Sequence, residues 1–228
     1  MPISTCIFDA YGTLFDVASA ARQVAAEPGR EKFAEKWPEI SRTWREKQLG
    51  YTWLRAVADA HTDFWQVTQD ALDFTLELHG FDDASLRERL LELYWNLSAY
   101  PEVPDVLARL QGANLATGIL SNGSPEMLDG AVASAGIAQW LDVVLSVEDV
   151  GVFKPHRWVY DLVGSHFGCE PGEVLFVSSN GWDAAHAAGY GFQTAWINRA
   201  GDPVDRLDWK PQHILTDLSG IPDLAADL

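Results

Sequence analysis

Four short polar clusters hold most of the side chains in this sequence that could do chemistry. They are Asp9 to Thr13, Ser121 to Gly123, Lys154 with Pro155, and Ser178 to Asp183. Asp9 and Asp183 supply carboxylate oxygens, which together could bind a hard cation. Lys154 could instead shield Asp9 with its own positive charge, so the residues alone leave both arrangements open. Any single cluster is compatible with an ordinary cap or loop, whereas their order along the chain is far more specific.

The clusters lie at or just after the carboxyl ends of expected strands. The first strand covers 5–8 and ends just before Asp9. The apolar pattern then predicts helices over 103–110, 125–135, 157–167 and from about 183, and strands over 115–120, 141–145, 174–177 and 193–197. Such alternation predicts a parallel sheet with helices on both faces. Ligands of open α/β sheets bind beyond the carboxyl ends of the strands, where the clusters would meet.

Residues 17–97 carry a different pattern, with helical periods and no convincing strand. Trp37, Ile40 and Trp44, for example, recur at helical spacing. Because the first strand of the sheet precedes this block, the block is an insertion that would cover the sheet as a cap. We therefore expect an α/β fold in two parts, a core of residues 1–16 and 98–228 and a helical cap of residues 17–97.

The composition argues against some classes of function. In the 228 residues, 16 Lys and Arg stand against 33 Asp and Glu, which gives a net charge of −17. This balance argues against nucleic acid and anionic membrane surfaces as partners. An anionic substrate would have to be held by a few local cations, which is feasible because salt screens charges beyond about 8 Å.

No targeting or redox signal stands out. The chain does not begin with a basic segment followed by an apolar stretch, and no apolar run approaches the length of a membrane span. The two cysteines, Cys6 and Cys169, lack the spacing of metal ligands, and a disulfide framework is implausible. Cys6 lies in an apolar run and is expected in the core. We expect a cytoplasmic globular protein.

Several segments resemble the haloacid dehalogenase superfamily. The run Phe-Asp-Ala-Tyr-Gly-Thr-Leu-Phe-Asp at 8–16 resembles its first motif, and Ser121, Lys154 and the acidic end of 178–183 resemble the other three. The resemblance is closer to the L-2-haloacid dehalogenases, and its further segments are 44–49 and 51–55 in the cap, 120–125, 179–184 and 196–199. It covers nearly the whole chain. It implies a Rossmann-like core with a helical cap and an active site between them.

Tyr11 separates the two main branches of this superfamily. In its phosphatases the residue two positions after the nucleophile is a second Asp that protonates the leaving alkoxide. A phenol with an ordinary pKa of about 10 is a poor substitute for a carboxylic acid at neutral pH. A halide leaves without a proton and needs a weakly hydrated donor, for which the guanidinium of Arg45 is suited. Lys154 could shield Asp9 without a metal, and the resemblance implies neither metal nor cofactor.

The resemblance implies a role for each site residue. Asp9 attacks the halogen-bearing carbon of a small 2-haloacid, and water then hydrolyses the aspartyl ester, which gives a 2-hydroxy acid of inverted configuration. Thr13 and Lys154 would orient Asp9, Ser121 with the backbone N–H groups after Asp9 would hold the substrate carboxylate, and Arg45 with Asn122 would cradle the halide. Ser178, Asn180 and Asp183 would position Lys154 and the water, with support from Tyr160. The apolar pocket would be lined by Tyr11, Leu49, Phe64 and Trp182.

Three residues depart from the pattern of the family. Ala10 follows Asp9 where many relatives have Leu, which would enlarge the substrate pocket. Glu46 stands where Gln is expected and could blunt the charge of Arg45. His186, three residues after Asp183 on an expected helix, could share its face and take a proton from the hydrolytic water. The alternative for His186 is a structural histidine.

Two rival functions remain open in the sequence. One is a Mg²⁺-dependent phosphatase of the same fold, which the missing second Asp disfavours. The other is a non-catalytic binding protein, which the intact set of Asp9, Lys154 and Asp183 disfavours. A homodimer is implied by the family resemblance, and exposed cap aromatics offer a surface for it.

Overall fold

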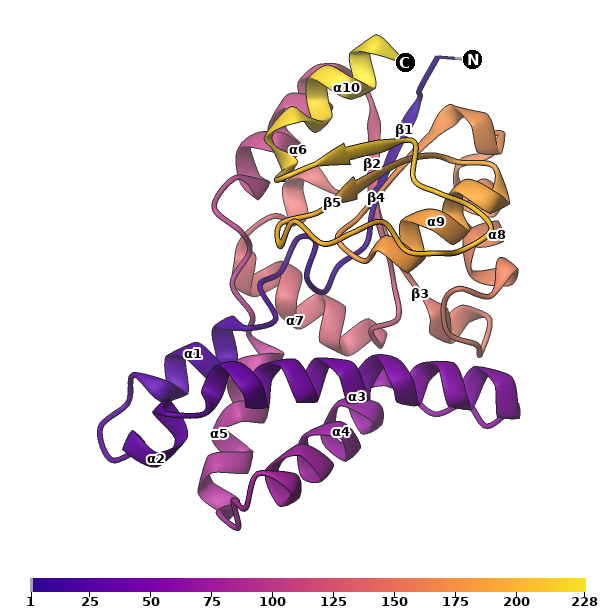
Figure 1. Cartoon of the computed structure of the whole chain (residues 1–228). Helices are drawn as coiled ribbons and strands as arrows, with labels where there is room; N and C mark the ends of the chain where they lie inside the picture. Colours follow the sequence, from indigo (N-terminus) through magenta and orange to yellow (C-terminus); the bar gives the residue numbers. More distant parts are fainter. Residues whose placement is uncertain (1) are drawn as a thin grey trace.

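Six parallel strands form one sheet in the larger of two lobes (Figure 1). The computed structural model describes residues 2–228. The strands are β1 (Thr5–Phe8), β2 (Ala116–Ser121), β3 (Val143–Ser146), β4 (Val174–Ser178), β5 (Gln193–Ile197) and β6 (His213–Leu215), in the order β3-β2-β1-β4-β5-β6. Each neighbouring pair is parallel. The expected α/β fold with a Rossmann-like parallel sheet is confirmed.

Helices cover both faces of this sheet. They are α6 (Val103–Gly112), α7 (Pro125–Ala135), α8 (Arg157–Phe167), α9 (Gly181–Tyr190) and α10 (Ile221–Asp227). α6 and α10 pack together on one side, and α8 and α9 pack on the other (Figure 1). Every residue of β1 and β4 is buried. Strands covered on both faces need side chains that tolerate burial in both directions, which explains their continuous apolar runs.

Most expected elements are present with boundaries shifted by a few residues. The strand expected over 141–145 lies at Val143–Ser146, and α9 begins at Gly181. β6 and α10 were not expected from the sequence. β6 has only three residues at the edge of the sheet, and none of them is fully buried, so its apolar pattern is weak. Short 3-10 helices complete the core at Ala138–Trp140, Val147–Asp149, Pro171–Glu173 and Leu218–Gly220.

The helices between residues 19 and 95 form the smaller lobe. They are α1 (Ser19–Ala25), α2 (Glu31–Ala34), α3 (Trp37–Ala58), α4 (Phe64–Leu78) and α5 (Ala84–Trp95). Figure 1 shows the long helix α3 running across the end of the core to which the strands point. Within residues 2–228, no helix has both the length and the apolar character needed to cross a membrane.

Two adjacent stripes on α3 explain how this helix serves both lobes. Trp44, Gln48 and Thr52 are buried at four-residue spacing. The indole of Trp44 donates to the carbonyl of Thr68 at 2.9 Å, and the amide of Gln48 donates to the hydroxyl of Thr68 at 3.0 Å, which fixes α3 on α4. Arg45, one residue later, begins a second stripe of side chains on the neighbouring face of α3. This stripe points away from α4.

Candidate active site

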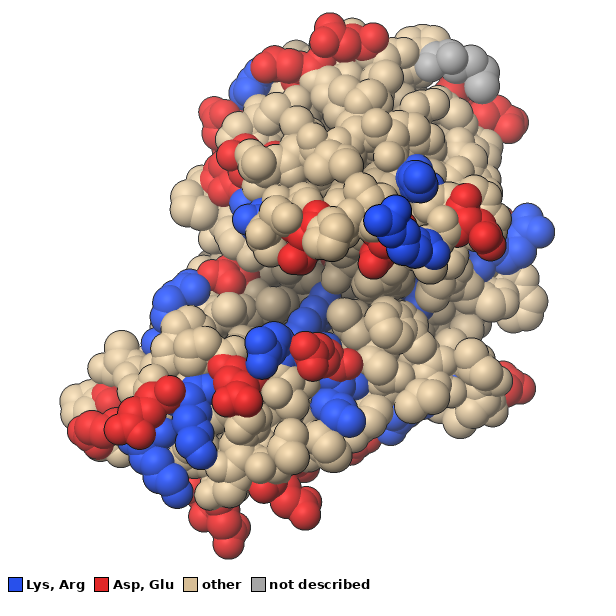
Figure 2. Space-filling model, viewed as in Figure 1, with Lys and Arg blue, Asp and Glu red and all other residues tan. Residues whose placement is uncertain are grey.

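The carboxyl ends of three neighbouring strands bring the polar clusters together. Asp9 follows β1 directly, Ser121 ends β2 and Ser178 ends β4. Because β1 lies between β2 and β4, these residues lie side by side at one edge of the sheet. A pocket at this edge combines side chains of the core and the cap: Asp9, Tyr11, Arg45, Leu49, Phe64, Ser121, Asn122, Lys154, Asn180 and Trp182. Figure 2 shows a groove between the two lobes, with Lys or Arg atoms inside it.

Three donors hold the carboxylate of Asp9, which is only 6% exposed. Its Oδ2 accepts hydrogen bonds from the hydroxyl of Thr13 at 2.9 Å and from the amide of Asn180 at 3.0 Å. Its Oδ1 accepts from the ammonium of Lys154 at 3.2 Å. Such a set fixes the orientation of the carboxylate and compensates the cost of burying its charge.

Lys154 connects the two carboxylates of the site. Its side chain is 1% exposed, and Nζ lies 3.2 Å from Asp9 Oδ1 and 2.8 Å from Asp183 Oδ2. Burial lowers the pKa of the Lys154 ammonium, but the charges of Asp183 and Asp9 outweigh burial and leave that pKa above its ordinary value. The amine therefore stays charged at neutral pH. The backbone N–H of Lys154 donates to Oδ1 of Asn122 at 2.9 Å, which fixes the loop on β2.

Asp183 is fully buried and receives three hydrogen bonds. The phenol of Tyr160 donates to Oδ1 at 2.7 Å, while Lys154 and the hydroxyl of Ser178 donate to Oδ2 at 2.8 and 3.2 Å. Burial raises the pKa of the Asp183 carboxyl, and Lys154 opposes that rise. Burial also raises the pKa of Tyr160 well above its ordinary value, so its phenol remains a donor. Asp183 is thus a more basic carboxylate than usual that lies next to Lys154.

The turn after Asp9 brings the hydroxyl of Thr13 back to the carboxylate. Gly12 has a φ of +93°, a conformation that suits glycine, and this tight turn returns the Thr13 hydroxyl to Asp9. That hydroxyl also accepts a hydrogen bond from the backbone N–H of Ser179 at 2.7 Å. Ser179 was not expected among the site residues, although its place between Ser178 and Asn180 in the fourth cluster was a usable signal.

Arg45 reaches the pocket from the second stripe of α3. Its Nη2 donates to the backbone carbonyl of Tyr11 at 3.0 Å and to Oδ1 of Asn180 at 3.4 Å. The carboxylate of Glu46 does not face Arg45; it is largely exposed and lies 3.8 Å from Arg42 on the outer face of the helix. Glu46 therefore does not neutralise Arg45 by direct contact.

An aromatic wall closes the cap side of the pocket. The rings of Tyr11 and Tyr94 are stacked with centroids 5.8 Å apart, and Tyr11 also contacts Phe64 at 5.7 Å. Burial raises the pKa of Tyr11 well above its ordinary value, so the phenol is neutral and a weak acid. Gly123 is needed beside this wall, because a Cβ there would lie 2.7 Å from the Tyr11 ring. Tyr94 was not expected at the site, since its sequence context is that of a core helix.

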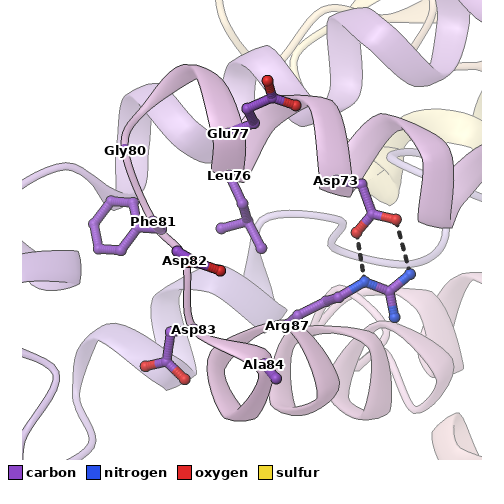
Figure 3. Close-up of a pocket in the computed structure, with 9 residues that line it drawn as sticks. All are labelled: Asp73, Leu76, Glu77, Gly80, Phe81, Asp82, Asp83, Ala84 and Arg87. Carbon is purple, nitrogen blue, oxygen red and sulfur yellow. Dashed lines mark hydrogen bonds and ion pairs between the residues drawn. The ribbon is translucent and has the colours of Figure 1, made fainter.

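A hollow of ≈ 640 Å³ lies within the cap and is less suited to an anion. Its wall includes the carboxylates of Asp73, Glu77, Asp82 and Asp83 (Figure 3). Its arginine, Arg87, is paired with Asp73. No group of three or more His, Cys, Asp or Glu side chains within residues 2–228 is placed to hold a metal ion.

Comparison with known proteins agrees with this geometry. A family model described as haloacid dehalogenase-like hydrolase matches residues 3–191. The chain belongs to this hydrolase family. The hydrolase is 42% identical over 224 residues to (S)-2-haloacid dehalogenase 1 of Pseudomonas sp. (strain CBS-3). The match covers 98% of this chain and 96% of that protein.

Two solved structures extend the likeness to the backbone. The hydrolase superimposes on a crystal structure of a dehalogenase with a TM-score of 0.93 and 39% identity, covering 98% of this chain and 97% of the other. It also matches L-2-haloacid dehalogenase from Xanthobacter autotrophicus with chloropropionic acid covalently bound. That match has a TM-score of 0.84 and 38% identity, and it covers 97% of this chain and 98% of the other.

Two residues expected at the site of this hydrolase lie elsewhere. The side chain of Ala10 is fully buried and is not part of the pocket lining, although its backbone follows Asp9 directly; its carbonyl accepts hydrogen bonds from the turn that follows. His186 is also absent from the lining of this pocket. Its Nδ1 lies 2.7 Å from the carbonyl of Trp182, and its ring packs on Trp209 with centroids 5.8 Å apart. This placement argues against His186 as the base for the hydrolytic water.

The other expected residues form two groups. One group lines the pocket, and it contains Asp9, Tyr11, Arg45, Leu49, Phe64, Ser121, Asn122, Lys154, Asn180 and Trp182. The second group lies behind the first and holds it by hydrogen bonds, and it contains Thr13, Tyr160, Ser178 and Asp183.

Proposed function

We propose that the protein hydrolyses short-chain (S)-2-haloalkanoic acids to (R)-2-hydroxy acids through an ester formed on Asp9. The observation that carries this proposal is the carboxylate of Asp9, held by Thr13, Asn180 and Lys154 in the wall of a pocket that core and cap side chains form together. The relative from Pseudomonas supports the substrate class, and the Xanthobacter structure with covalently bound chloropropionic acid supports a covalent intermediate.

The first step forms the ester. A carboxylate oxygen of Asp9 attacks the substrate carbon that bears the halogen, the carbon–halogen bond breaks, and the halide leaves with the bonding electrons. In-line attack from the opposite side inverts that carbon. The Thr13, Asn180 and Lys154 contacts restrict the carboxylate to one orientation, which reduces the entropy that must be lost on reaching the transition state.

Local cations offset the negative charge of the whole molecule. Arg45 and Asn122 line the pocket and would receive the departing halide, because guanidinium is weakly hydrated and always charged. Ser121, with the backbone N–H groups after Asp9, would hold the substrate carboxylate. The net charge of −17 offers no long-range attraction, so specificity for an anion rests on this short-range set.

The second step releases the product. Water attacks the carbonyl carbon of the Asp9 ester, the alkoxide leaves from that carbon and takes up a proton, and the carboxylate of Asp9 is restored. The oxyanion that develops on Asp9 is stabilised by the ammonium of Lys154 and the hydroxyl of Thr13. We assign the proton of the water to Asp183, the second carboxylate on the ammonium of Lys154 at 2.8 Å; because Asp183 lies behind the pocket, the proton reaches it past Lys154. The configuration of the substrate carbon does not change in this step.

We further propose that the reaction needs neither metal nor cofactor. The ammonium of Lys154 stands between Asp9 and Asp183, the two carboxylates that would otherwise share a cation. Tyr11, a neutral phenol with a raised pKa, stands where a phosphatase needs its acidic Asp. Both features disfavour phosphoryl transfer, in which the leaving alkoxide needs a proton and the phosphate needs charge neutralisation.

Chloride release separates these functions. We expect chloride from (S)-2-chloropropanoate but not from its R enantiomer, and we expect the rate to be unchanged by a chelator. Phosphate release from a phosphomonoester that needs added Mg²⁺ would support the phosphatase instead. Absence of both activities in a folded sample would support the binding protein.

We also propose that the protein is a cytoplasmic homodimer. Cys6 and Cys169 are both free thiols, as expected in a reducing compartment. Burial of Cys6 in the core raises the pKa of its thiol to about 12. Exposed Phe74 and Leu78 on α4 offer an apolar surface for a second copy. Light scattering of the purified protein tests the dimer, and Leu78→Lys is expected to weaken it.

A further inference from the structure

An apolar hollow of ≈ 520 Å³ lies next to the pocket at Asp9. Its lining is mostly apolar and includes Trp53, Ala56 and Val57 of α3, Phe153, Trp182 at the start of α9, and Leu207. Two imidazoles, those of His156 and His186, complete the wall. The pocket at Asp9, by contrast, has a free volume of only ≈ 10 Å³. That is about the space of one water molecule, so even a small 2-haloacid enters only if part of the pocket wall moves.

Trp182 is the wall shared by the pocket and the hollow. Its ring meets the ring of Trp53 edge to face, with centroids 5.4 Å apart and an interplanar angle of 87°. Its buried Nε1 has no hydrogen-bond partner among the described residues. Asp9 and Lys154, in contrast, are held by charged hydrogen bonds. Rotation of the Trp182 ring would break its contact with Trp53 and no side-chain hydrogen bond, so no polar interaction holds this shared wall in place.

Apolar side chains continue from the pocket into the hollow on two further sides. Leu49 lines the pocket and Trp53 lines the hollow, and these residues lie four apart on α3 and therefore on one face. Phe64 lines the pocket, and its ring packs on that of Phe153, which lines the hollow, with centroids 6.4 Å apart. The alkyl chain of a substrate that extends from the pocket past Trp182 would thus contact apolar side chains along its length.

We propose that this hollow is a second part of the substrate site, which takes the alkyl chain of 2-haloalkanoic acids longer than the pocket at Asp9 can hold. The ring of Trp182, resting against Trp53, is the movable partition between the two parts. The charged head of the substrate stays with Asp9 and Arg45, and the tail beyond the third carbon lies among Trp53, Ala56 and Phe153. This inference rests on the proposed dehalogenase function and extends its substrate class.

The test compares two substrates on variants that fill or charge the hollow. The measured quantity is the ratio of kcat/KM for (S)-2-chlorohexanoate to that for (S)-2-chloropropanoate, which is independent of the fraction of active protein. Ala56→Phe fills the hollow and is expected to lower the ratio by about tenfold or more. Ala58→Phe, on the exposed side of the same helix, is the matched control and should keep the wild-type ratio.

A second pair of variants serves where Ala56→Phe fails to fold. Val57 is 90% exposed at the rim of the hollow, so Val57→Asp is expected to fold, and its charge disfavours an alkyl tail. We expect it to lower the same ratio severalfold, while Leu54→Asp, also exposed but outside the lining, leaves the ratio unchanged.

Four results would overturn the inference. An unchanged ratio in both Ala56→Phe and Val57→Asp would contradict the alkyl site but not the dehalogenase function. Turnover of the short substrate alone in the wild type would have the same meaning. Halide release from neither substrate overturns both. An unchanged ratio together with loss of a dimer, seen by light scattering of Ala56→Phe, assigns the hollow to a second copy of the chain.

Discussion

Nζ of Lys154 lies 3.2 Å from Oδ1 of Asp9, with both side chains buried at the end of β1. A second carboxylate, Asp183, lies 2.8 Å from the same ammonium. One positive charge therefore serves two buried negative charges, and the remaining oxygen atoms are satisfied by Thr13, Asn180 and Tyr160. The stability of the core and the chemistry of the site both depend on this cation.

Replacement of the cation tests its structural role. Lys154→Met leaves Asp9 and Asp183 buried without their partner, and we expect it to lower the free energy of unfolding by about 3–5 kcal/mol at neutral pH. Without the opposing charge of Lys154, the pKa of Asp183, already raised by burial, rises further. A carboxyl whose pKa is higher in the folded than in the unfolded state destabilises the folded state at pH values above its folded-state pKa. This destabilisation disappears as the pH falls toward the pKa of the carboxyl in the unfolded state, about 3.9.

Urea unfolding at about pH 7 and about pH 5 provides the measurement. The difference between the wild type and Lys154→Met should shrink at the lower pH. Lys210→Met, at an exposed position, is the control and should show no difference at either pH. An equal loss of stability at both pH values would mean that packing of the lysine stem, rather than its charge, is what matters.

Replacement of the nucleophile tests the ester. Asp9→Asn keeps the shape of the side chain but makes it a very poor nucleophile, and we expect kcat to fall by at least about 10³-fold with the fold intact. In the wild type, a single turnover in ¹⁸O water should label Asp9, because water attacks the ester carbonyl, and label should reach the product only in later turnovers. Mass spectrometry of the Asp9 peptide and of the product measures both. Label in the first product would exclude the ester route.

Much of the site could be predicted because its chemistry lies at strand ends. Asp9, Ser121 and Ser178 each follow an apolar run, and the topology of a parallel sheet brings such positions together regardless of loop detail. The order of the polar clusters along the chain then predicts the family, which the family model over residues 3–191 confirms.

The features that could not be predicted depend on the direction in which single side chains point. Glu46 is adjacent to Arg45 in sequence but points to solvent, since neighbours on a helix are about 100° apart. Ala10 follows Asp9 but turns into the core. Tyr94 lies on α5 and reaches the site only through the packing of the cap, where it stacks on Tyr11.

Replacement of Arg45 tests the halide cradle. Arg45→Lys keeps the charge but loses the planar fork, and the shorter reach to the Tyr11 carbonyl and Asn180 leaves a strongly hydrated ammonium in the pocket. We expect kcat/KM for chloride release to fall about 10- to 100-fold. Arg42→Lys, one turn earlier and exposed, is the control and should be neutral. Wild-type chloride release by Arg45→Lys would exclude the cradle.

Replacement of His186 tests whether a histidine activates the hydrolytic water. Residues three apart on a helix differ by about 60° in direction, and here that offset takes His186 away from the face on which Asp183 is buried. Its Nδ1 proton is donated to the carbonyl of Trp182, and its ring rests on Trp209. We therefore expect His186→Asn to turn over (S)-2-chloropropanoate at close to the wild-type rate, and we expect no substrate-dependent mass on the Asp9 peptide. Asp183→Asn, which removes the proposed base, should accumulate that mass together with a burst of about one equivalent of halide per site. If the ester accumulated in His186→Asn and not in Asp183→Asn, the base would be the histidine, and the side chain would have to reach the pocket by a movement of α9.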